Sequence, residues 1–173
     1  DYGFAVVPYV NPGTTLTFTI RDILEQSGRP KVLVMQNHGV IVHDDDEAKC
    51  LSIHEDMNQR LAAFFGLAPD AFPRARVKVQ GGGFVSDTPW LHERLKGGRY
   101  PDSLLLEEPL YPDQMVFFND TLGESAVIDR QTGVTHYNLP ENTAITLEET
   151  LCAVTFITQT IREKGYTLQT MGE

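Results

Sequence analysis

The chain has only two cysteines among its 173 residues, Cys50 and Cys152. They lie far apart in the sequence and form no C-x-x-C pair, so a disulfide framework is not indicated. Both fall on predicted helices. We therefore expect two reduced thiols on core-facing positions of a cytoplasmic protein.

Long apolar runs and an excess of positive charge are also missing. No apolar stretch approaches the roughly 20 residues that cross a membrane. The 14 basic side chains are outnumbered by 24 acidic ones, for a net charge of −10. Such a chain offers no basic face to nucleic acid or to a membrane surface, so we expect neither as a partner.

Common catalytic signatures are absent as well. The sequence contains no Gly-x-Ser-x-Gly and no His-x-His. The run Gly81–Gly83 could wrap an anion with backbone N–H groups, but it lacks a following P-loop lysine and the Rossmann spacing. His92 and His136 have no partner at metal-ligand spacing, so we interpret both as surface polar residues.

What is present is a reversal of the chain with a histidine at its tip, between Lys31 and His43. Two apolar runs, Val32–Met35 and Val40–Val42, flank Asn37-His38-Gly39. This pattern predicts two buried strands joined by a tight turn in which Gly39 takes a positive φ. An imidazole held on rigid strands suits metal ligation, although His38 could instead hydrogen-bond a backbone group at the turn.

The elements around this hairpin can be read from local signals. A short strand over residues 4–10 is limited by Pro8. A helix follows, capped by Thr14 or Thr15 and ended at Ser27-Gly28. After the hairpin, Asp44–Glu47 caps a helix over about residues 46–65. We expect one side of this second helix to be buried through Cys50 or Leu51, His54, Met57 or Asn58, Leu61, and Phe64 or Phe65.

The order of these features resembles the class II aldolase/adducin family. The chain reads Pro-Tyr, a Pro-Gly-Thr turn, a helix, and a strand that ends in Asn-His-Gly, over roughly residues 5–65. The matching positions are Pro8, Tyr9, Pro12, Gly13, Thr14, Asn37, His38, Gly39 and Ala48.

The resemblance implies an α/β fold in which residues 1–68 form the C-terminal half of a three-layer α/β/α class II aldolase-like core. It implies that His38 is the third imidazole ligand of a catalytic divalent metal, Zn²⁺ or another, which acts as a Lewis acid on the enediolate. It also places Tyr9 near the substrate cleft, where a phenol can donate a proton or orient a hydroxyl. Tyr9 could equally be a strand aromatic packed on the core.

The function implied is that of a metal-dependent lyase that cleaves a ketose phosphate or related sugar by retro-aldol chemistry. A pentulose-phosphate 4-epimerase of the same family, or a non-catalytic adducin-like binding or assembly module, remains an alternative. The family carries its His-x-His pair and catalytic acid upstream of the matched region. We therefore expect an inactive fragment that forms a homo-oligomer or associates with the missing N-terminal half.

A metal site built from His38, His43 and His54 alone is disfavoured by periodicity. If a strand continues from Val40, His43 points to the face opposite Val40 and Val42. His54 lies about two turns into the following helix, at a position that the sequence does not relate to the hairpin.

Residues 69–173 are expected to form a small α+β C-terminal extension, after a break at Gly66–Pro73. Its predicted elements are a strand Val77–Gln80, a helix-like piece Pro89–Lys96, a strand Met115–Phe118, a hairpin of Ala126–Asp129 with Val134–Tyr137, and a final helix. That helix opens on a capping box at Thr146–Glu149. Its expected buried stripe is Leu147, Leu151, Val154, Ile157 or Phe156, and Ile161. Tyr111–Val116 resembles a segment that follows the core in longer bacterial members of the family.

Overall fold

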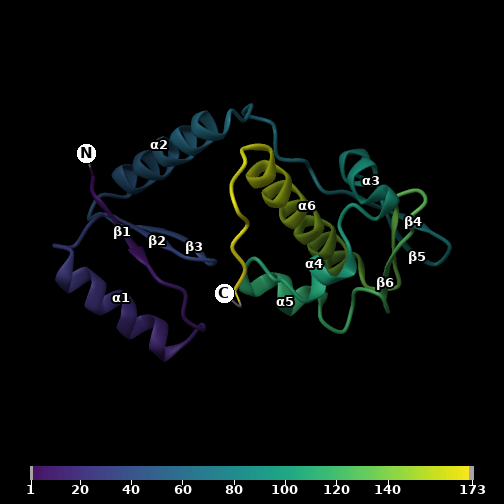
Figure 1. Ribbon diagram of the computed structural model, residues 1–173, viewed down its shortest axis with the longest axis horizontal. Helices are drawn as coiled ribbons and strands as arrows, with labels where there is room; N and C mark the ends of the chain where they lie inside the picture. The colour runs from purple at the N-terminus through teal and green to yellow at the C-terminus, as the bar shows by residue number, and fades with distance from the viewer. Residues whose placement is uncertain (1, 172–173) are drawn as a thin grey trace. The chain divides into compact units, whose positions relative to one another are not determined.

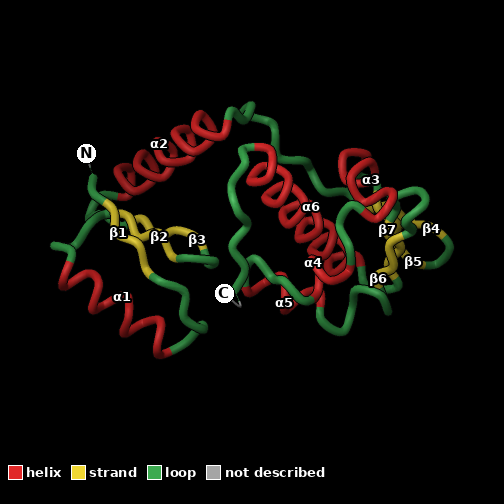
Figure 2. Tube along the Cα trace, in the orientation of Figure 1, coloured by secondary structure: helices red, strands yellow, loops and turns green. Residues whose placement is uncertain are grey.

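The computed structural model describes residues 2–171 and has a mixed α/β architecture with two small sheets (Figures 1 and 2). The chain divides into two compact units, Asp1–Leu67 and Ala68–Glu173. This division falls one residue before the boundary expected from the sequence. Among the described residues, no helix is both long enough and apolar enough to cross a membrane.

The sheet of the first unit has three strands in the order β1 (Phe4–Val7), β2 (Val32–Met35) and β3 (Gly39–Val42). β1 runs parallel to β2, and β2 runs antiparallel to β3. Val7 is paired with Met35, and Met35 with Gly39. The segments that follow β1 and β2 therefore leave the sheet at the same edge, where β3 begins.

The turn of the β2–β3 hairpin confirms the expected backbone conformation. Gly39 has a φ of 140°, and Asn37 lies in the left-handed region with a φ of 57°. Asparagine tolerates this region better than other side-chain-bearing residues. The His38 amide donates to Met35 O at 3.1 Å, which closes the turn and sets His38 at its tip.

Two helices flank the strands of this unit, α1 (Thr14–Gln26) and α2 (Glu47–Phe65) (Figure 1). Asp46 caps α2 as predicted, because its carboxylate accepts hydrogen bonds from the Ala48 and Lys49 amides. The predicted threonine cap of α1 is wrong, since Gly13 occupies the N-cap and no side chain caps this helix. Thr14 is already the first helical residue, one position past the capping site.

The expected buried side of α2 is only partly correct. Leu51 is 66% exposed, Leu61 48% and Phe64 60%, and His54 is exposed as well. The partly buried side carries Cys50, Met57 and Phe65, which belong to the expected set, together with Ile53. Both stripes satisfy helical spacing, so periodicity alone could not choose between them.

The sheet of the second unit is antiparallel, in the order β4 (Val77–Gln80), β5 (Gly83–Ser86), β7 (Thr135–Tyr137) and β6 (Ala126–Ile128). The predicted β4 strand and the β6–β7 hairpin are confirmed. Gly81 and Gly82 form the β4–β5 turn with φ values of 62° and 85°. A Cβ on Gly83 would lie 2.6 Å from Tyr137 O, so strand pairing requires glycine there. The run Gly81–Gly83 therefore forms the turn of the β4–β5 hairpin and the first residue of β5.

Short helices connect these strands: α3 (Pro89–Leu95), the 3₁₀ turn η1 (Lys96–Gly98), α4 (Asp102–Leu106) and α5 (Pro112–Phe118). The strand predicted at Met115–Phe118 is wrong, because these residues complete α5. Gln114 explains the difference. Its buried side chain accepts from the Leu110 amide at 2.8 Å and donates to Leu105 O at 2.9 Å, which ties α5 to α4.

The last helix, α6 (Glu141–Glu163), begins five residues before the predicted capping box. The Thr146 hydroxyl donates to Asn142 O within the helix, so it does not cap one. Leu147, Leu151 and Val154 are buried as predicted. Phe156 and Ile161 are only half-buried, and Ile157 is 37% exposed.

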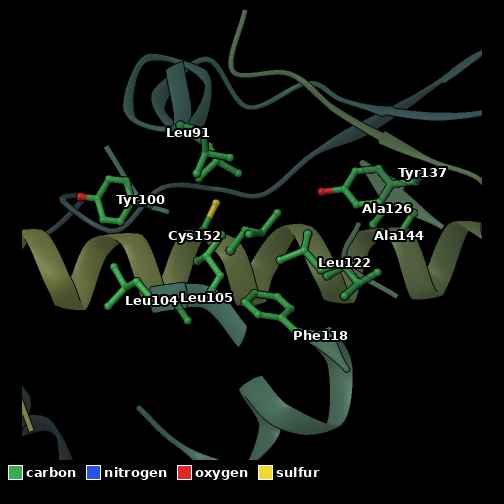
Figure 3. Close-up of a cluster of buried hydrophobic side chains, with 14 of the residues drawn as sticks. Leu91, Tyr100, Leu104, Leu105, Phe118, Leu122, Ala126, Tyr137, Ala144 and Cys152 are labelled. Carbon is green, nitrogen blue, oxygen red and sulfur yellow. The ribbon is translucent and has the colours of Figure 1, made fainter. Parts of the chain in front are cut away.

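α6 supplies much of the hydrophobic core of the second unit (Figure 3). The side chains around it come from α3, α4, α5, the sheet and the segment before α4, and they include Leu91, Tyr100, Leu105, Phe118 and Tyr137. Cys152 is a fully buried free thiol whose pKa is raised to about 12, mainly by burial. Cys50 is a half-buried free thiol.

Replacing Leu151 with alanine should destabilise the second unit by about 2–5 kcal/mol, because the side chain is fully buried and leaves a cavity. Trp90, the single tryptophan of the chain, packs against this core and reports its unfolding in a denaturant titration. Val116→Ala is the control, since Val116 is 70% exposed and should change stability by less than about 0.5 kcal/mol. An equally small loss for Leu151→Ala would show that the buried face of α6 is misassigned.

Candidate functional site

The residues singled out in the first unit lie where β1 and β2 end. The Gln36 amide donates to Val7 O at 2.9 Å and so extends the parallel pairing by one residue. The Gln36 side chain then accepts a hydrogen bond from the Tyr9 amide at 3.3 Å. Tyr9 and His38 are thereby placed on neighbouring segments at one edge of the sheet.

The structure brings these two side chains into contact. The ring centroids of Tyr9 and His38 are 5.5 Å apart, with an interplanar angle of 37°. The Tyr9 hydroxyl donates to Asn11 Oδ1 at 3.2 Å. Hydrogen bonds therefore fix Tyr9 both at its backbone amide and at its side-chain hydroxyl. Twenty-eight intervening residues separate the two rings in the sequence.

The His38 imidazole has one partnered and one unpartnered nitrogen. Nδ1 lies 3.4 Å from Gln36 O, at the long end of hydrogen bonding, while Nε2 is buried and has no hydrogen-bond partner. With a proton on Nδ1 directed at this carbonyl, Nε2 holds a lone pair. Leaving a buried polar atom unpaired costs about 1–3 kcal/mol, so this nitrogen is an unsatisfied group at the tip of the hairpin.

The other histidines of this unit are engaged elsewhere. His43 Nε2 lies 2.8 Å from Pro30 O, and His54 Nδ1 lies 3.2 Å from the Asn58 amide nitrogen on α2. Within residues 2–171, no group of three or more histidine, cysteine or acidic side chains is arranged to hold a metal ion. The three histidines therefore do not form a shared site in this structure.

Gln36 and Asn11 are the site residues that the sequence reasoning missed. Each fixes Tyr9, one through its backbone amide and the other through its hydroxyl. A signal for Gln36 was available, because it is the first polar residue after the apolar run of β2. Asn11 immediately precedes the Pro12-Gly13-Thr14 turn, and its position carries no such signal.

An ion pair closes the other end of the hairpin. Lys31 precedes β2, Asp44 follows β3, and the Lys31 ammonium donates to the Asp44 carboxylate. This hydrogen bond is the largest cause of the lowered pKa of Asp44 and the raised pKa of Lys31, and the Asp46 amide lowers the pKa of Asp44 further. The pair holds the strands together at their open end, opposite His38.

A second polar cluster lies in the core of the other unit. Glu148 on α6 is fully buried, and its carboxylate accepts hydrogen bonds from Ser86 Oγ and from the Tyr137 hydroxyl, each at 2.5 Å. His92 Nε2 lies 2.7 Å from Ser86 Oγ, so the prediction that His92 is a surface residue is wrong. The sequence contains no signal for this cluster, because its four members lie on four separate elements, β5, α3, β7 and α6.

The groups of this cluster are not arranged like those that activate a nucleophilic serine. The carboxylate contacts Ser86 rather than the far nitrogen of His92, and Ser86 is only 2% exposed. Burial and the neighbouring Glu148 raise the pKa of Tyr137, so the phenol stays protonated and keeps donating to the carboxylate. The arrangement satisfies the buried oxygens of Glu148 with hydrogen bonds and ties α6 to the sheet.

Comparison with known proteins adds no assignment: no family model, no curated protein and no solved structure matches this chain.

The Lys31–Asp44 pair predicts a pH dependence for the hairpin. Because the folded-state pKa of Asp44 is lowered, its contribution to stability is present above the unfolded pKa of about 4 and is lost as pH falls through the folded value. In Asp44→Asn, protection of the His43 amide from hydrogen exchange should therefore be reduced near pH 6, and the difference from wild type should vanish in stronger acid. Asp45→Asn is the control and should show a far smaller difference. A constant deficit for Asp44→Asn at every pH would contradict this account.

Proposed function

We propose that this chain contributes a metal-ligating face to a class II aldolase-like lyase that cleaves a ketose phosphate or related sugar by retro-aldol chemistry. The observation that carries the proposal is the buried, unpartnered Nε2 of His38 beside the ring of Tyr9. Both residues follow the carboxyl ends of parallel strands, a position at which α/β proteins commonly bind ligands. The order of motifs that resembles the class II aldolase/adducin family supports the same reading.

His38 fits a divalent metal such as Zn²⁺ as one ligand of several. An imidazole nitrogen with a free lone pair is a preferred zinc donor, but catalytic zinc sites have three protein ligands. Residues 2–171 hold no group of three. In our proposal the remaining ligands come from another polypeptide segment, which in the family carries a His-x-His pair.

The metal, when bound, supplies Lewis-acid stabilisation of the negative charge that develops on the substrate's oxygens during carbon–carbon cleavage. The residues of this chain orient the His38 imidazole and the Tyr9 hydroxyl. Gln36 O faces His38 Nδ1, which aims Nε2 away from that carbonyl. Asn11 Oδ1 accepts the hydrogen bond that the Tyr9 hydroxyl donates, which leaves the phenol oxygen's lone pairs available to a substrate hydroxyl.

Exposed apolar side chains support association with a further chain or segment. Phe4 and Val6 on β1 are 69% and 57% exposed, and Leu51 and Phe64 on α2 are 66% and 60% exposed. Apolar area of this kind on β1 and α2 can be covered by a further chain or segment. These side chains fit a homo-oligomer or a complex with the segment that completes the metal site.

The metal role of His38 can be tested by substitution in the protein assembled with its complementary segment. The complex should bind about one zinc per chain, and His38→Ala should lower zinc affinity or activity by about 10-fold or more. His54→Ala is the matched control, since this exposed histidine pairs only with Asn58 and should leave zinc content unchanged. Unchanged zinc content in His38→Ala would remove the proposal.

The chain of residues 1–173 alone should behave differently. One imidazole cannot hold zinc against water at useful affinity, so the purified chain should carry less than stoichiometric zinc and should not cleave sugar phosphates. Its exposed apolar side chains should make it self-associate. Elemental analysis and light scattering measure both properties. A monomer with stoichiometric zinc would mean that the site is complete within these residues.

A further inference from the structure

A cleft of about 590 Å³ lies in the second unit, away from the cluster around Glu148. It is bordered by the segment that leads into β4, by α5 with the residue before it, and by α6. Its side chains are of two kinds. The aromatic ones are Phe72, Tyr111 and Phe117, and the charged ones are Arg74, Asp113 and Glu149.

The aromatic walls are held in place by the core. The Phe72 ring packs edge-on against Phe156 of α6, with centroids 5.3 Å apart. The Tyr111 hydroxyl reaches Thr150 O at 3.4 Å, which directs the phenol toward α6. Burial raises the pKa of Tyr111, and the nearby Asp113 carboxylate raises it further, so the ring stays neutral. These contacts give the cleft apolar surfaces that do not depend on a ligand.

The charged side chains around the cleft are not neutralised by one another. Arg74, Asp113 and Glu149 are all exposed, and none belongs to an ion pair in the described part of the chain. Elsewhere in this unit, Arg130 pairs with Asp102. The cleft thus presents two carboxylates and one guanidinium, from three different elements, beside aromatic faces.

We propose that this cleft binds a small zwitterion that carries an ammonium group and a carboxylate or phosphate on an apolar body. The ammonium is attracted by Asp113, by Glu149 and by the faces of the aromatic rings. The anionic group pairs with the guanidinium of Arg74, whose parallel N–H donors match two oxygens of a carboxylate or phosphate. The volume falls within the range of small-molecule sites.

Pairing of opposite charges favours the zwitterion over simpler ligands. A ligand with only an ammonium leaves Arg74 facing a like charge, and one with only an anion meets two carboxylates. A neutral apolar molecule uses the aromatic rings alone. With both charges on one apolar body, the two carboxylates share the ammonium, the anionic group pairs with Arg74, and the body contacts the rings.

Three probes of the same shape separate these cases: phenylalanine, phenethylamine and 3-phenylpropionate. The full chain, labelled with ¹⁵N, is titrated with each probe, and amide shifts are followed at residues 72–75, 111–117 and 146–153. Phenylalanine should saturate with a millimolar or lower Kd, and each singly charged probe should bind about tenfold more weakly. Equal affinity for all three probes, or no saturation by about 20 mM phenylalanine, would overturn the proposal.

Variants that remove a charge from the cleft identify which residues bind the carboxylate and which bind the ammonium of the probe. Arg74→Ala should abolish the preference for phenylalanine over phenethylamine, and the pair Asp113→Asn and Glu149→Gln should abolish the preference over 3-phenylpropionate. Arg99→Ala and Glu107→Gln are controls, because both residues are exposed and lie outside the cleft. The tryptophan unfolding transition verifies that each variant is folded. Preferences that persist in folded variants would contradict the assignment.

Discussion

The parallel pairing of β1 with β2 is the constraint on which the first unit depends. It places Val7 opposite Met35. The next hydrogen bond, from the Gln36 amide to Val7 O, extends the same pairing one residue beyond the strands. A shift of one residue would turn the strand faces over and separate the segments that hold Tyr9 and His38. Because those segments leave at one edge, a short polar contact through Gln36 suffices to place the two rings together. The site is thus a consequence of strand register.

The second unit depends on a different interaction, the buried carboxylate of Glu148. A polar group in an apolar core is costly unless hydrogen bonds satisfy it, and here Ser86 and Tyr137 do so from two strands. Such a group favours one arrangement of α6 on the sheet, because sliding the helix by a turn would leave the carboxylate unpaired. The surrounding leucines could pack in several ways, whereas this pair of hydrogen bonds has one geometry. The polar cluster therefore adds specificity to a core that hydrophobic burial stabilises.

Several elements were predictable because their signals are local. The turn at Asn37–Gly39, the Asp46 cap and the buried stripe of Leu147, Leu151 and Val154 all depend on neighbouring residues or on helical spacing. The errors arose where local signals were ambiguous. The run ending at Phe118 has strand-like residues, yet Gln114 and the core make it helical, and α6 extends five residues before its apparent cap. Tertiary burial decided both cases.

For the candidate site, the sequence by itself determined that a histidine stands at the tip of a rigid hairpin and that a tyrosine lies toward the end of the first predicted strand. The structure ends that strand at Val7, so Tyr9 follows it. Only the tertiary structure decided that their rings lie 5.5 Å apart, that His38 Nε2 is buried without a partner, and that His43 turns away to Pro30 O. It also decided which apolar stripe of α2 stays exposed. The reason is physical: turns and caps are set by bonds between near neighbours, whereas contacts across a sheet depend on register and burial, which residues far apart in the sequence determine jointly.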